Sequence, residues 1–151
     1  MNTTEKLEAL RNLMRQEGID AFITPSTDPH SGEYVPERWK SRRWISGFTG
    51  SAGTAVVTLD KAALWTDSRY FIQAAEQLEG TGFLLMKEKI EGTPSVAEWL
   101  GSTLPAGSTV AVDGWVNTAS EVEELENELK AYGLTLRTDI DPYNTIWTDR
   151  P

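Results

Sequence analysis

The sequence predicts an α/β/α sandwich built on a mixed sheet of about six strands. Short apolar runs typical of strands alternate with segments whose apolar residues recur every three or four positions, the order expected when helices cover both faces of a sheet. Two of the strands flank Asp60-Lys61, which predicts an antiparallel hairpin and therefore a mixed sheet. The chain has 151 residues, 39% of them hydrophobic, which suits one domain with a buried core.

The N-terminal part of the chain begins with a predicted helix over residues 3–16, because its leucines recur at helical spacing. Asn2 and Glu5 have the spacing of a capping box at its start. The apolar run 21–24 then predicts a buried strand. Residues 25–36 contain three prolines and several small polar residues, so they are expected to form a loop.

A basic, aromatic segment at 37–46 predicts a short helix whose charges form a solvated face. The glycine-rich bend at 46–53 precedes the hairpin strands 54–59 and 62–66. The bend lacks the Lys-Ser/Thr ending of a phosphate-binding loop and leads into a strand rather than a helix. A tight turn is therefore the favoured interpretation, although its N–H groups can still face a ligand.

The rest of the chain continues the alternation of helices and strands. The predicted helices cover 69–78, a segment opened by Thr93-Pro94, and 119–131, and the predicted strands cover 83–86, 110–112 and 134–137. The helix residues expected to be buried are Phe71, Ile72, Ala75, Leu78, Val96, Trp99, Leu100, Val122, Leu125, Leu129 and Tyr132. The glutamates between them predict a solvated outer face on the last helix. The domain is expected to span residues 1–138, with 139–151 as the start of a linker to a second domain.

The composition disfavours several classes of function. The chain carries 14 basic and 23 acidic residues, for a net charge of −9, and nucleic acid binding needs a basic face. It contains no cysteine, which excludes disulfides, thiolate metal sites and cysteine nucleophiles. It has no apolar run long enough to span a membrane, and its first residues are polar rather than signal-like. We therefore expect a cytoplasmic protein without a nucleic acid or membrane partner.

His30 is the single histidine, so any histidine-based chemistry depends on it. Asp28 and Glu33 lie close to it in the same predicted loop, which allows a carboxylate–histidine site. The simpler interpretation, which we favour, is a loop histidine hydrogen-bonded to Asp28.

The segment Trp65-Thr66-Asp67-Ser68-Arg69-Tyr70 lies where a predicted strand leads into a helix, the position at which α/β sheets place ligand contacts. Asp67 is well placed to cap the helix. Arg69 is not explained by capping, because a cation in the first turn opposes the helix dipole. It is expected either to pair with Asp67 or to face an external carboxylate or carbonyl group.

Much of the chain resembles a known family. The stretches that carry the resemblance are DPHSGEY at 28–34, RRWISGFTGSAGTAVV at 42–57, ALWTDSRYF at 63–71 and NTIWTDRP at 144–151. They resemble the N-terminal, creatinase/prolidase-like domain of Xaa-Pro aminopeptidases in their long, three-domain form, and the junction that follows it. This sequence departs from the family at Gly32, where serine is usual, and at Ser68, where glycine is usual.

The resemblance implies a ribonuclease H-like α/β fold and a non-catalytic domain that borders the substrate entrance and helps oligomerisation, the full enzyme being a homodimer. The parent enzyme would release an N-terminal residue that precedes proline. Two divalent metals, expected to be manganese, would be held by a C-terminal domain beyond these residues. The resemblance makes Arg69 a contact of the peptide substrate, and makes Asp28 and His30 weaker candidates at the same entrance.

Two other functions remain open. The chain is alternatively a non-enzymatic, creatinase-like assembly or recognition module. Creatine and related C–N hydrolases share the fold, but the motifs fit the peptidase better.

Overall fold

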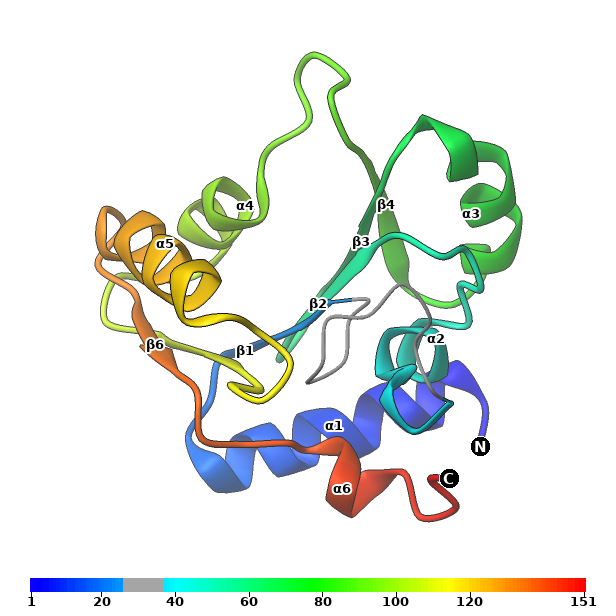
Figure 1. Ribbon diagram of the computed structural model, residues 1–151, viewed down its shortest axis with the longest axis horizontal. Coiled ribbons are helices and arrows are strands. Elements are labelled where there is room, and N and C mark those ends of the chain that lie inside the picture. The colour runs from blue at the N-terminus through cyan, green and yellow to red at the C-terminus, as the bar shows by residue number, and fades with distance from the viewer. Residues whose placement is uncertain (26–36) are drawn as a thin grey trace.

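The computed structural model describes residues 1–25 and 37–151, and it places six strands in one sheet in the order β4-β3-β2-β1-β5-β6 (Figure 1). The strands are β1 (Ala21–Pro25), β2 (Thr54–Thr58), β3 (Ala62–Thr66), β4 (Phe83–Lys87), β5 (Thr109–Val112) and β6 (Thr135–Arg137). β1, β2 and β3 pair antiparallel, whereas β3–β4, β1–β5 and β5–β6 are parallel. The predicted mixed sheet and its hairpin are confirmed.

Helices cover both faces of the sheet, which confirms the predicted sandwich (Figure 1). The helices are α1 (Thr3–Glu17), α2 (Ser41–Ser46), α3 (Phe71–Leu78), α4 (Val96–Thr103), α5 (Ala119–Lys130) and α6 (Tyr143–Ile146), with short 3-10 turns η1 (Glu37–Trp39) and η2 (Ser68–Tyr70). One buried cluster joins the sheet to α1, α2, α3 and α6, and a second joins it to α4 and α5.

The ends of the helices follow the predicted local signals. Asn2 and Glu5 form a capping box on α1, and Gly18 closes that helix in the left-handed conformation. Thr118 and Glu121 form the same device on α5. The helix predicted to open at Thr93-Pro94 begins later, because the Ser95 side chain caps α4 instead.

Three predicted buried residues are exposed. Ile72 on α3 and Tyr132 after α5 have exposed fractions of 80% and 41%, and Ala75 on α3 is exposed as well. Tyr70 ends η2 and does not belong to the helix, so α3 starts at Phe71 and turns Ala74 and Leu78 toward the core. The prediction was wrong because the preceding turn sets where this eight-residue helix begins, and the spacing of apolar residues does not show that turn.

Arg42 corrects the prediction of a solvated basic face on residues 37–46. Its side chain is buried, and its Nη1 donates to the Phe48 carbonyl at 3.0 Å. Burial lowers its pKa to about 10, so it remains charged at neutral pH. Its cation also lies 5.0 Å from the centre of the Phe48 ring. Arg42 therefore ties α2 to the bend that follows it.

Residues 139–151 pack against the domain. Tyr143 is buried and its hydroxyl hydrogen-bonds Thr24 of β1 at 2.6 Å, while Trp147 stacks on Trp44 of α2. The predicted linker therefore begins with a segment that contributes to the core, and a second domain beyond it stays a prediction.

The glycine-rich bend wraps around the buried Phe48 ring. A Cβ atom added at Gly50 would overlap the end of that ring, and one added at Gly53 would lie 3.0 Å from the Trp65 carbonyl. Glycine is needed at Gly50 because of this close approach of the ring to the backbone.

We expect Gly50→Ala to lower the free energy of unfolding by about 1–3 kcal/mol, the usual cost of overpacking a filled core. Urea denaturation of the 151-residue chain measures it. Phe48→Leu provides the background control, since a smaller side chain relieves the overlap and should shrink the effect of Gly50→Ala. An equal loss in both backgrounds would contradict the steric explanation.

Candidate functional site

The turn after β3 carries the candidate site. Asp67 has an extended backbone and its Oδ1 accepts the backbone N–H of Arg69 at 3.0 Å, which caps η2. The same carboxylate accepts two bonds from the Arg69 side chain, Nε to Oδ1 and Nη2 to Oδ2, both at 2.9 Å. The ion pair considered for these two residues is present, whereas Asp67 caps the short turn η2 and the helix α3 begins at Phe71 without a side-chain cap.

Both members of this pair are charged and accessible. The Arg69 hydrogen bond is the main cause that lowers the pKa of Asp67, and the same bond raises the pKa of Arg69. The Arg69 side chain remains 66% exposed. A fixed, exposed guanidinium next to the carboxyl end of a strand is suited to bind a carbonyl or carboxylate group through parallel hydrogen bonds.

Ser68 occupies the position at which the resembling family has glycine. Among the described residues other than glycine, a positive φ is found at Lys89. Ser68 therefore lies in a backbone conformation that any residue adopts, and serine leaves the placement of Arg69 intact.

Tyr70 connects Arg69 to the glycine-rich bend. The Arg69 cation lies 5.0 Å from the centre of the Tyr70 ring, within the range of a cation–π contact. The Tyr70 hydroxyl shares a short hydrogen bond with the Ser51 hydroxyl. Phe48 meets the Tyr70 ring edge-on at 5.9 Å. The bend, the tyrosine and the guanidinium therefore form one connected surface.

Two glutamines of α3 hold the other side of the bend. Gln77 accepts the backbone N–H of Thr49 at 2.9 Å, and Gln73 and Gln77 each donate to the Thr49 hydroxyl at 2.9 Å. These bonds occupy the Thr49 N–H, so this amide is not free to bind a phosphate. The interpretation of the bend as a structural turn is supported.

A groove of about 350 Å³ lies where β3 and β4 end. Its lining comes from Thr54, Trp65, Glu88, Lys89, Thr93, Pro94, Ser95, Val96 and Glu98. The positive charge of Lys89 helps lower the pKa of Asp67, which places the groove in the electrostatic range of the Asp67–Arg69 pair. Ligands of α/β proteins bind at the carboxyl ends of strands. The groove and Arg69 both lie at such strand ends.

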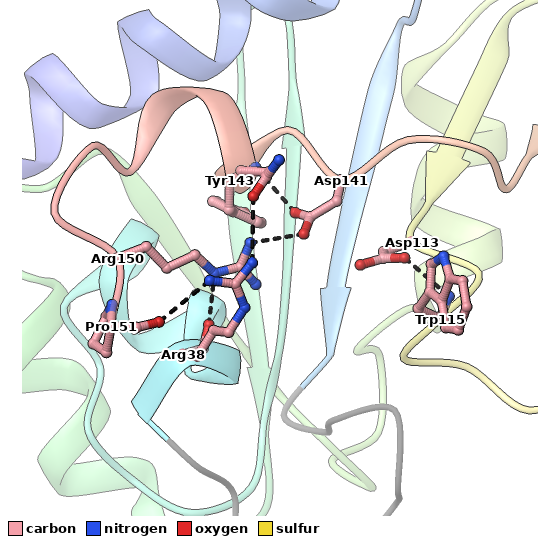
Figure 2. Close-up of polar contacts among 8 residues, drawn as sticks. Arg38, Asp113, Trp115, Asp141, Tyr143, Arg150 and Pro151 are labelled. Carbon is pink, nitrogen blue, oxygen red and sulfur yellow. Dashed lines mark hydrogen bonds and ion pairs between the residues drawn. The ribbon is translucent and has the colours of Figure 1, made fainter.

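A second polar cluster lies at the carboxyl ends of β1 and β5 (Figure 2). Arg150 is its centre: only 4% of its side chain is exposed, and its Nη1 donates to Asp141 at 2.7 Å. Its Nε donates to the Arg38 carbonyl at 2.8 Å, and the rings of Trp39 and Trp147 lie 4.8 and 5.7 Å from its cation. Sequence reasoning missed this cluster because it treated the tail as a linker.

Asp113 faces the same cluster from the end of β5. Its Oδ1 accepts the Trp115 N–H at 2.9 Å, and burial is the main cause that raises its pKa. A cavity of about 20 Å³, enough for one water molecule, is lined by Asp113, Asp141 and Arg150. The buried Nη2 of Arg150 has no protein partner within the described ranges. The cluster is too small for a peptide and serves to fasten the tail.

Asp28, His30 and Glu33 lie outside the described residues, which end at Pro25 and resume at Glu37. Within residues 1–25 and 37–151, no three histidine, cysteine or carboxylate side chains are grouped to hold a metal. The described residues therefore do not fit a dinuclear metal centre. No helix in these ranges is long and apolar enough to cross a membrane.

Comparisons with known proteins agree on one family. The profile of the creatinase/prolidase N-terminal domain matches residues 6–140. Aminopeptidase P2 of Arabidopsis thaliana is 44% identical over 149 residues, which cover 96% of this chain and 21% of that protein. A probable Xaa-Pro aminopeptidase P of Aspergillus oryzae is 46% identical over 136 residues, covering 90% of this chain and 21% of its own. The chain therefore spans about a fifth of these relatives.

Solved structures show the same fold. The X-prolyl aminopeptidase of Caenorhabditis elegans, a cytosolic enzyme with a dinuclear active site, superposes with a TM-score of 0.93 at 35% identity over 100% of this chain and 26% of its own. The N-terminal domain of the peptidase PepQ from Mycobacterium tuberculosis shares the fold at a TM-score of 0.68 and 21% identity, covering 95% of this chain and 98% of that one. Because that domain was solved alone, the fold forms without the rest of such an enzyme.

Proposed function

Since the chain belongs to the creatinase/prolidase N-terminal domain family, we propose that it is the non-catalytic N-terminal domain of a metal-dependent Xaa-Pro aminopeptidase. The observation that carries the proposal is the identity of 44% across nearly the whole chain with an aminopeptidase P of which it spans only 21%. The parent enzyme removes an N-terminal residue that precedes proline, and it works in the cytoplasm as a homodimer.

The domain supports the reaction without performing it. The catalytic metals, which we expect to be manganese, activate water when they are held by a separate domain. The residues described here border the entrance and recognise the peptide, with Arg69 as the contact to a peptide carbonyl or carboxylate. The groove at the carboxyl ends of β3 and β4 offers space for extended chain. We assign Asp28 and His30 a weaker part in the same entrance.

We expect the full-length protein to cleave an Xaa-Pro peptide in the presence of Mn²⁺, and the 151-residue chain to show no turnover. One histidine and scattered carboxylates cannot reproduce a two-metal site. Mass spectrometry of the released N-terminal residue measures the turnover of both proteins. A peptide carrying alanine in place of proline is the specificity control.

Two outcomes would contradict the proposal. Turnover that co-elutes with the 151-residue chain would make the domain itself catalytic. A full-length protein that folds, binds Mn²⁺ and leaves the peptide intact would favour the assembly or recognition module instead.

A further inference from the structure

The guanidinium of Arg69 is held in one orientation, although two thirds of the side chain is exposed. Its Nε and Nη2 edge is bound by both oxygens of Asp67. Because the same carboxylate also accepts the Arg69 backbone N–H, the side chain is folded over its own turn instead of extending into solvent. The Nη1 group has no hydrogen-bond partner within the described ranges, so the edge that carries it is available.

A second contact restrains the same group. The Tyr70 ring lies 5.0 Å from the Arg69 cation, and the Tyr70 hydroxyl is tied to Ser51 in the glycine-rich bend. Arg42 and Gln77 in turn anchor the bend through Phe48 and Thr49. The orientation of Arg69 is therefore linked to the body of the domain, not only to its own turn.

We propose that Asp67 and Tyr70 are positioning residues that preorganise Arg69, so that its free Nη1 edge faces the peptide. The inference rests on the proposed contact between Arg69 and substrate. An unrestrained arginine loses side-chain freedom when it binds a ligand, and that loss weakens binding. Asp67 removes this loss in advance, and its negative charge also keeps the guanidinium from pairing with other carboxylates of this acidic chain.

Asp67→Asn in the full-length enzyme tests the proposal. Asparagine is as good an N-cap as aspartate, so η2 should persist while the charge and one of the two acceptors for the guanidinium are lost. We expect KM for an Xaa-Pro peptide to rise roughly two- to ten-fold, the effect of releasing one long side chain. Tyr70→Phe and Ser51→Ala each remove one hydroxyl and break the same Tyr70–Ser51 hydrogen bond, so they should have similar, smaller effects on KM.

A double-mutant cycle with Arg69→Ala separates positioning from a structural role. If Asp67 acts through Arg69, Asp67→Asn should have no further effect on KM once Arg69 is alanine. Asp149→Asn, at an exposed aspartate of the tail, is the matched control and should leave KM unchanged. The melting temperature of each variant shows whether the domain stays folded.

The possible outcomes are distinct. A loss of activity in Arg69→Ala with wild-type KM in Asp67→Asn would overturn the positioning role and leave the proposed function intact. Effects of the two substitutions that simply multiply would also overturn it, because Asp67 would then act independently. Wild-type activity in Arg69→Ala would overturn both the substrate contact and the positioning that depends on it. It would not contradict the proposal that the chain is a domain of an Xaa-Pro aminopeptidase.

Discussion

Arg150→Met is expected to lower the free energy of unfolding of the domain by about 3–5 kcal/mol, the range measured when one partner of a buried ion pair is removed. Methionine keeps much of the apolar volume between Trp39 and Trp147, so the loss reports mainly on charge and hydrogen bonding. Asp141 Oδ2 and the Arg38 carbonyl both lose the donor that Arg150 supplies. Urea denaturation measures the change.

The pH dependence of the stability lost in Arg150→Met shows whether the missing positive charge causes the loss. Burial raises the pKa of Asp113, and Arg150 opposes that rise. Without Arg150 the pKa rises further, so the folded chain binds a proton more readily than the unfolded chain. The variant should therefore regain stability as the pH falls from 7 toward about 4, the ordinary pKa of an aspartate.

Arg43→Met is the matched control, because Arg43 is exposed on α2 and meets Glu37 only at 4.0 Å. It should change stability by less than about 0.5 kcal/mol. An equally small effect of Arg150→Met would show that the aromatic contacts, not the cation, fasten the tail.

Most of the helices and strands could be predicted because interactions between residues close in the sequence decide where they begin and end. The hairpin of β2 and β3 follows from two apolar runs joined by a two-residue turn, and the capping boxes of α1 and α5 are fixed by residues three positions apart. The tail was misjudged although it carries a signal. Tyr143, Ile146 and Trp147 have the spacing of one helical face, which predicts a turn of helix packed on a core.

The candidate site was only partly accessible to sequence reasoning. The two-residue spacing of Asp67 and Arg69 allowed both a cap and an ion pair, and the structure contains both. Contacts between segments that are far apart in the sequence have no such spacing signal. The bond between Ser51 and Tyr70 and the approach of Arg150 to Asp141 and Arg38 depend on how the sheet orders its strands, which no short window of sequence specifies.

Arg69→Lys is expected to reduce kcat/KM of the full-length enzyme by about ten- to a hundred-fold, the usual consequence of losing a charged hydrogen bond to a substrate. Arginine binds Asp67 with one edge and leaves Nη1 available for the proposed contact with the peptide. Lysine carries one ammonium group in place of two separate edges, so binding Asp67 and binding a planar carbonyl or carboxylate group compete. Because lysine keeps the positive charge, the loss in kcat/KM measures the contribution of the guanidinium geometry.

The stability of the domain should hardly change in this variant, because exposed ion pairs contribute little to folding. The experiment pairs kcat/KM of the full-length enzyme with the melting temperature of the 151-residue chain, which holds its own core and whose fold forms alone in a relative. Arg43→Lys, at an exposed position on α2, is the matched control and should keep both values. An unchanged kcat/KM together with a lowered melting temperature would make the Asp67–Arg69 pair structural and remove Arg69 from substrate recognition. A reduced kcat/KM at an unchanged melting temperature is the expected result, because the Arg69 side chain is largely exposed and does not belong to the core.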